Sequence, residues 1–131
     1  MATYKSFEEL EIRQLSRELC NDIFEVIENP GLKNNFRLAN QIDGSSGSIM
    51  DNIAEGFERN GNKEFIQFLY ISKASCGETR SQLYRILDRN FISDEKFEVL
   101  KNKTTDLSRK IGGFIFYLQS SDLKGSKYKN R

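Results

Sequence analysis

The chain has 131 residues, a net charge of +1 and a charged fraction of 30%. It contains no histidine, which excludes Ser-His-Asp and Cys-His catalysis and every histidine-ligated metal site. No apolar run approaches the ~18 residues of a membrane span, and the N-terminus lacks the features of a signal peptide. We therefore expect one cytoplasmic domain with no membrane partner, built from long helices that each bury one stripe.

The first helix is predicted over residues 7–28. Ser6 is expected to cap it, with Glu9 in the capping-box position three residues later. Its apolar residues recur at steps of three or four and share one face: Ile12, Leu15, Leu19, Ile23 and Ile27. The tripeptide Asn29-Pro30-Gly31 is expected to end it, because proline disfavours helix in the preceding residue.

The second helix is predicted over residues 34–59, although its segment 44–48 has the composition of a flexible loop. Each glycine costs about 1 kcal/mol in a helix interior. The inward apolar stripe nevertheless keeps its phase through this segment: Leu38, Ile42, Ile49, Ile53 and Phe57. We therefore expect an uninterrupted helix.

A third helix, capped by Asn62, is predicted over residues 63–89. Counting outward from Gly61 places Ser46 of the second helix opposite Cys76 of the third. Small residues of two neighbouring helices then meet, and the glycines are predicted to let the two backbones approach closely.

The fourth helix is predicted over residues 94–119, with Ser93 as its cap. Its buried stripe follows an unbroken heptad pattern: Phe97, Leu100, Thr104, Leu107, Ile111, Phe114 and Leu118. Short connections favour antiparallel neighbours. The prediction is an all-α fold, a single antiparallel up-down-up-down four-helix bundle over residues 1–121, followed by a basic, disordered tail over residues 122–131.

Basic residues concentrate in the second half of the chain. Lys96, Lys103 and Lys110 recur every seven residues beside the stripe of the fourth helix, and more basic residues lie in the tail: Lys124, Lys127, Lys129 and Arg131. Together they are a candidate surface for nucleic-acid phosphates. The alternative is an ordinary solvated face, in which Asp106 neutralises Lys103 and Lys110.

Three polar residues of the second and third helices allow two interpretations. Asn52 and Glu55 lie one turn apart and form either a polar site at the end of the bundle or a structural network, with Glu55 paired to Arg59. Glu78 is expected to pair with Arg80, with Arg85 or with a partner chain. We predict no catalytic residue, no metal site and no cofactor.

The two cysteines, Cys20 and Cys76, lie in helical apolar patterns and are predicted to be buried free thiols. Several large apolar residues lie off the predicted stripes: Phe24, Phe68, Tyr70, Ile71, Ile115, Phe116 and Tyr117. Such residues widen the apolar faces beyond what one bundle buries, which favours self-association.

Two segments carry a family resemblance: Ser48-Ile49-x-x-Asn52-Ile53-Ala54-Glu55-Gly56, and Phe65-x-x-Phe68-Leu69 with Ser75-x-x-Glu78. The chain resembles, over residues 7–118, the four-helix-bundle proteins encoded in intervening sequences of bacterial 23S ribosomal RNA genes. That family includes the accessory variability determinant of diversity-generating retroelements. The resemblance implies a ring-like homopentamer without enzymatic activity, with RNA or DNA and a reverse transcriptase or other protein as partners.

The sequence and the resemblance together predict a non-enzymatic oligomeric scaffold or adaptor that binds nucleic acid through its basic surface. The alternative is a protein–protein interaction module with no nucleic-acid role, whose apolar side chains dock another polypeptide.

Overall fold

The computed structural model of the protein describes residues 4–123, in which all regular structure is helical and no strand occurs. Four long helices form a bundle: α1 (Glu11–Ile27), α3 (Phe36–Glu58), α4 (Asn62–Asp88) and α5 (Asp94–Leu123). A 3-10 turn, η1 (Phe7–Glu9), precedes them, and the short helix α2 (Pro30–Asn34) joins α1 to α3. The predicted all-α class is confirmed.

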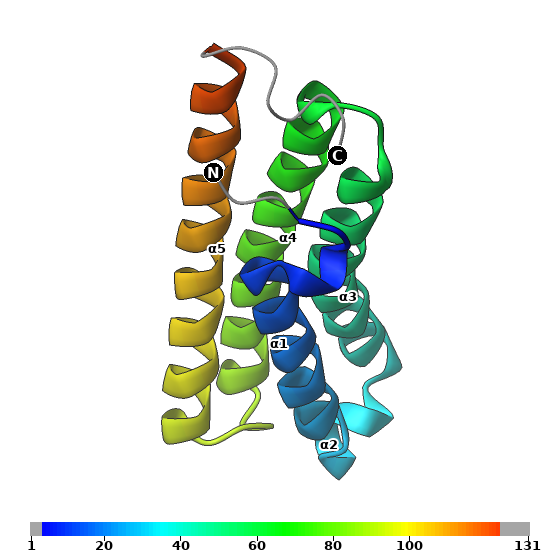
Figure 1. Ribbon diagram of the computed structural model, residues 1–131. Coiled ribbons are helices and arrows are strands. Elements are labelled where there is room, and N and C mark those ends of the chain that lie inside the picture. The colour runs from blue at the N-terminus through cyan, green and yellow to red at the C-terminus, as the bar shows by residue number, and fades with distance from the viewer. Residues whose placement is uncertain (1–3, 124–131) are drawn as a thin grey trace.

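The long helices lie roughly along one axis, and the colour gradient reverses between successive ones (Figure 1). Hydrogen bonds define this arrangement at residue level for α3 and α4. Ser45 accepts from Thr79 at 2.8 Å, and Ser48 accepts from Ser75 at 3.0 Å. Rising numbers on α3 therefore pair with falling numbers on α4, so the two helices are antiparallel.

The N-terminal segment differs from its prediction. Leu10 adopts an extended conformation, with φ −75° and ψ 127°, and separates the 3-10 turn from α1. Its side chain is almost fully buried, which accounts for the break. Ser6 precedes the 3-10 turn without a side-chain capping bond, so α1 begins at Glu11 rather than at Phe7.

The Asn-Pro-Gly tripeptide ends α1 but also starts a helix that the sequence prediction omitted. The Asn29 side chain accepts from the backbone N–H of Gly31 at 2.9 Å, and Pro30 occupies the first turn. Proline is favoured there because its missing N–H would have no partner in any case. Asn35 then caps α3, since its side chain accepts from the N–H of Leu38.

Helix α3 passes without a break through residues 44–48, as predicted. The predicted reason is wrong, however: a Cβ atom placed at Gly44, Gly47 or Gly77 would meet nothing within 4 Å. Serines make the contact instead, and Ser45 and Ser46 are buried. The glycines lie on the outer side of the helix pair and do not bring the backbones together.

A seam of buried hydroxyl groups joins α3 to α4. Ser45 donates to the Gln82 amide oxygen at 2.6 Å while it accepts from Thr79. Farther along, the hydroxyl of the fully buried Ser72 donates to the backbone carbonyl of Ile49. Because each hydroxyl has a partner, hydrogen bonds within the protein offset the cost of removing these polar groups from water.

Glycine does determine packing at the α3–α4 turn. A Cβ at Gly56 would lie 2.6 Å from the Cβ of Phe68 and 2.9 Å from Cδ1 of Phe65. Gly61 has φ +112°, a conformation that favours glycine, and it occupies the cap position of α4. The predicted cap, Asn62, is instead the first residue of α4 and is buried.

Helix α5 begins as predicted, since the Ser93 hydroxyl accepts from the N–H of Lys96 at 3.1 Å. It extends to Leu123, and so includes the first two residues of the predicted tail. The rest of that tail, residues 124–131, lies outside the described residues. No helix between residues 4 and 123 is long and apolar enough to cross a membrane.

The contrast between Gly56 and Gly44 leads to a stability test. Gly56→Ala is expected to lower the free energy of unfolding by about 1–3 kcal/mol, because the added methyl group overlaps Phe68. Gly44→Ala adds a methyl group in open space and is expected to raise it by up to about 1 kcal/mol through helix propensity. Urea unfolding of both variants measures this, and equal effects would contradict the packing described.

Candidate nucleic-acid interface

The lysines of α5 face the carboxylates of α1. The Lys103 ammonium lies 2.7 Å from the Asp22 carboxylate and 3.1 Å from that of Glu18. Lys110 lies 3.3 Å from the Glu11 carboxylate. Carboxylates of α1 therefore pair with lysines of α5, and two of the seven predicted phosphate ligands, Lys103 and Lys110, hold α5 to α1. Phosphate binding by these lysines stays a prediction.

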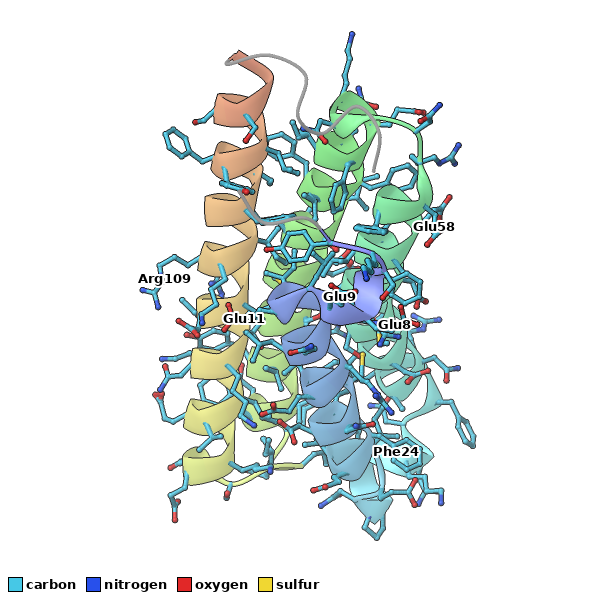
Figure 2. The ribbon with its side chains drawn as sticks, viewed as in Figure 1. Glu8, Glu9, Glu11, Phe24, Glu58 and Arg109 are labelled. Atoms are coloured by element: carbon cyan, nitrogen blue, oxygen red, sulfur yellow. The ribbon has the colours of Figure 1, made fainter. Side chains whose placement is uncertain are left out.

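Other parts of the predicted lysine surface are dispersed. Asp106 was expected to neutralise Lys103 and Lys110 but pairs with Arg109 at 2.6 Å. Figure 2 shows Arg109 projecting away from the bundle. Lys96 lines a hollow at the opposite end of α1, beside Glu25. The tail members lie outside the described residues: Lys124, Lys127, Lys129 and Arg131.

A second set of basic residues follows one face of α4. The positions at one helical phase include three basic and two aromatic side chains and contain no Asp or Glu: Lys63, Ile66, Tyr70, Lys73, Gly77, Arg80 and Tyr84. Lys63, Lys73 and Arg80 form no ion pair within residues 4–123. The positive charge of this face is therefore not neutralised by its neighbours there.

Contacts place this face of α4 along α5. Arg80 donates to the Thr105 hydroxyl at 3.3 Å, and the Gln119 amide donates to the Tyr70 hydroxyl at 3.4 Å. We call this surface the α4–α5 face and define it by its contacting and neighbouring residues: Tyr70, Lys73, Arg80 and Tyr84 of α4, with Thr105, Gly112 and Gln119 of α5.

The α4–α5 face combines the two features that bind single-stranded nucleic acid. Tyr70 and Tyr84 are 52% and 47% exposed, so each can offer a ring for stacking. Lys73 and Arg80 lie between them along α4 and carry the positive charge that phosphate contacts require. The nearest carboxylate on α5 at this helical phase, Glu98, is already paired with Lys101 at 3.1 Å. Our sequence analysis missed this set, because it attributed Tyr70 to self-association although the seven-residue spacing from Lys73 to Arg80 was available.

Three of the family-motif residues, Ser48, Asn52 and Ser75, form a hydrogen-bonded network across α3 and α4. Asn52 donates to the carbonyl and the hydroxyl of Ser48, which in turn accepts from Ser75 of α4. The predicted ion pair between Glu55 and Arg59 forms at 3.1 Å. The adjacent motif residue Gly56 is the close-packed glycine of the turn, which explains why this segment requires glycine.

Glu78 lies on the exposed side of α4 and forms no ion pair within residues 4–123. Its two expected partners bond elsewhere: Arg80 to Thr105, and Arg85 to the Gln41 side chain at 2.9 Å. Pairing of Glu78 with a partner chain stays a prediction.

The thiols are not arranged for chemistry. Cys76 is buried, and burial raises its pKa to about 12, so the nucleophilic thiolate is suppressed. Cys20 is only half-buried, a correction to its prediction; burial also raises its pKa, and its thiol donates to the Ser46 carbonyl. Within the described part of the chain, no three Cys, Asp or Glu side chains are grouped to hold a metal ion.

The fold and this surface together define a class: an all-α bundle protein with one basic, aromatic helix face. The family model described as 23S rRNA-intervening sequence protein matches residues 8–113. The chain belongs to this family, and the predicted resemblance is confirmed.

A solved structure has the same fold. It is the 1.70 Å crystal structure of a protein with unknown function from the S23 ribosomal protein family of Bacteroides thetaiotaomicron VPI-5482. The TM-score is 0.72 at 24% sequence identity, over 79% of this chain and 97% of that chain. This likeness supports the bundle architecture alone. No curated protein matches the chain.

The ion pairs of Lys103 lead to a stability prediction. Lys103→Met is expected to lower the free energy of unfolding by about 1 kcal/mol, because it leaves the largely buried Asp22 carboxylate without its cation. Lys33→Met is the matched control, since Lys33 pairs only with the half-exposed Glu28, and a change within about 0.5 kcal/mol is expected. Urea unfolding at pH 7 measures both.

The pH dependence of this difference has a definite sign. The hydrogen bond to Asp22 raises the pKa of the Lys103 ammonium above its ordinary 10.5. The ion pair therefore contributes fully below pH 10.5, and its contribution falls as the pH rises through the raised value. A difference between wild type and Lys103→Met that grows above pH 10.5 would contradict the ion pair.

Proposed function

We propose that the protein is a non-enzymatic cytoplasmic scaffold that binds single-stranded nucleic acid through the α4–α5 face. One observation carries the proposal: Lys73 and Arg80, without ion pairs in residues 4–123, lie between the exposed rings of Tyr70 and Tyr84. The net charge of +1 gives no general attraction for nucleic acid. Binding would instead depend on where the free cations lie.

The dimensions of the face suit a short strand. Tyr70 and Tyr84 are 14 residues apart on one helix, which corresponds to about 21 Å at 1.5 Å per residue. A strand along α4 would place phosphates at Lys73 and Arg80 and stack bases at the two rings.

Self-association is the second part of the proposal. Among the described residues, five large apolar side chains outside the α4–α5 face are substantially exposed: Phe24, Phe36, Ile71, Val99 and Phe116. The exposed fractions of Phe36 and Phe116, 73% and 71%, are high for phenylalanine in a monomer. We propose a homo-oligomer, a pentamer by family resemblance, which would repeat the α4–α5 face and increase the avidity for one strand. A reverse transcriptase or another protein as partner rests on the same resemblance.

The nucleic-acid proposal is tested with a charge-matched pair of double variants. Lys73→Gln with Arg80→Gln removes two cations from the α4–α5 face, and Lys33→Gln with Arg37→Gln removes two elsewhere. Fluorescence anisotropy with a labelled 20-nucleotide RNA, at 50 to 200 mM salt, measures affinity. In the double variant of Lys73 and Arg80, we expect the magnitude of the slope of log K against log salt to fall by about 1.4. In the control double variant of Lys33 and Arg37, we expect the slope to stay unchanged.

Two results would overturn the assignment to this face. One is the absence of wild-type RNA binding at 50 mM salt. The other is an equal loss of affinity in both double variants, which would mean that net charge, rather than the α4–α5 face, controls binding.

Self-association has its own measurement. Light scattering of the purified protein at micromolar concentration is expected to give a mass several times the 15.2 kDa of one chain. Phe116→Ser is expected to shift this distribution toward smaller species, because it removes the exposed ring. A wild-type mass of one chain would exclude the oligomer at that concentration.

A further inference from the structure

A hollow of about 370 Å³ lies between the N-terminal segment, the start of α1 and α5. Its volume falls in the range of roughly 300–1,000 Å³ that is typical of small-molecule sites. It opens on the flank of α5 that faces α1, whereas Gly112 and Gln119 on the opposite flank face α4. The hollow is therefore separate from the α4–α5 face.

Aromatic rings form one wall of the hollow. Phe114 and Tyr117 stack with ring centroids 5.8 Å apart and planes 27° apart. Tyr4 packs edge-on against Phe114, with centroids 6.1 Å apart. Phe114 is itself held by the buried Phe65, at 5.8 Å, so the wall is anchored in the core. An aromatic wall of this kind favours a flat ligand.

A carboxylate and an ammonium group form the polar rim. Glu11 and Lys110 lie 3.3 Å apart and line the same hollow, with side chains 67% and 39% exposed. An ion pair this exposed costs little to rearrange. The carboxylate can accept from a ligand N–H while the adjacent ammonium donates to a ligand carbonyl or ring nitrogen. Because the ion pair has no net charge, the rim gives no net attraction to an anionic or a cationic ligand.

We propose that this hollow binds a neutral heteroaromatic ring with a hydrogen-bond donor and an acceptor on one edge, the chemistry of a nucleobase. The ring packs against Phe114 and Tyr117, and its edge meets Glu11 and Lys110. Such a ring can come from a free nucleoside or from an unstacked base of a strand. Nucleosides carry no phosphate, so their binding does not depend on the cations of the α4–α5 face.

Gly113 provides a way to fill the hollow. It lines the cavity, and a Cβ atom built on it would meet nothing within 4 Å. Gly113→Leu therefore adds a side chain at the wall of the hollow without a backbone clash, and it improves the helix propensity of α5. Gly44→Leu is the matched control, because Gly44 is equally open but lies on the outer side of α3.

The experiment is calorimetric titration of wild type, Gly113→Leu and Gly44→Leu with adenosine, guanosine, cytidine and uridine. We expect saturable binding of at least one nucleoside to wild type, a loss of at least tenfold in affinity in Gly113→Leu, and a change of less than twofold in Gly44→Leu. Lys110→Met removes the donor and keeps the aliphatic stem, and it is expected to weaken the same nucleoside about tenfold.

Three results would overturn the proposal: no saturable nucleoside binding to wild type, equal affinity in Gly113→Leu, or binding of toluene without any nucleoside. The double variant that combines Lys73→Gln and Arg80→Gln separates this site from the proposed function. When it is titrated with nucleosides, it should bind them like wild type although its affinity for RNA is reduced. Single-stranded RNA that competes with the nucleoside for the wild-type protein would identify the strand as the source of the base; no competition would identify the free nucleoside.

Discussion

The hydroxyl seam between α3 and α4 is the constraint on which the rest of the bundle depends. Ser45, Thr79, Gln82 and Ser72 are buried, and each hydrogen-bonds to a specific group. A shift of one helix along the other would leave these groups without partners, at a cost of about 1–3 kcal/mol each. An apolar interface would tolerate such a shift far better. The seam therefore fixes the register that places Gly56 beneath Phe68.

Periodicity was sufficient to predict the long helices but not the way in which they meet. The stripe through Ile42 and Ile49 showed that α3 is continuous, because helical phase depends only on sequence spacing. Neighbouring residues in a helix point about 100° apart, so Gly44 and Ser45 lie on different faces. Composition alone does not show whether Gly44 or Ser45 points toward α4. The packing was therefore attributed to the glycine rather than to the serine.

The candidate site was harder to predict for a similar reason. The heptad of lysines on α5 was visible in the sequence, but the carboxylates opposite depend on the register between α1 and α5. Asp22 and Lys103 are 81 residues apart along the chain, and no local pattern links them. The spacing of Lys73 and Arg80 on α4 was just as visible, yet only the structure shows that they lack carboxylate neighbours within residues 4–123.

The pairing of helices determines where positive charge stays available. Carboxylates of α1 form ion pairs with lysines of α5. The seam between α3 and α4 is formed by hydroxyl and amide groups, which carry no net charge. The α5 residues that contact Tyr70, Lys73 and Arg80 are neutral, namely Gln119, Gly112 and Thr105, so Lys73 and Arg80 gain no counter-charge from them. A chain of net charge +1 can thus carry one basic face, because within residues 4–123 seven carboxylates pair with other cations: Glu11, Glu18, Asp22, Glu28, Glu55, Glu98 and Asp106. Polyanion binding by such a protein would depend on that face rather than on the total charge.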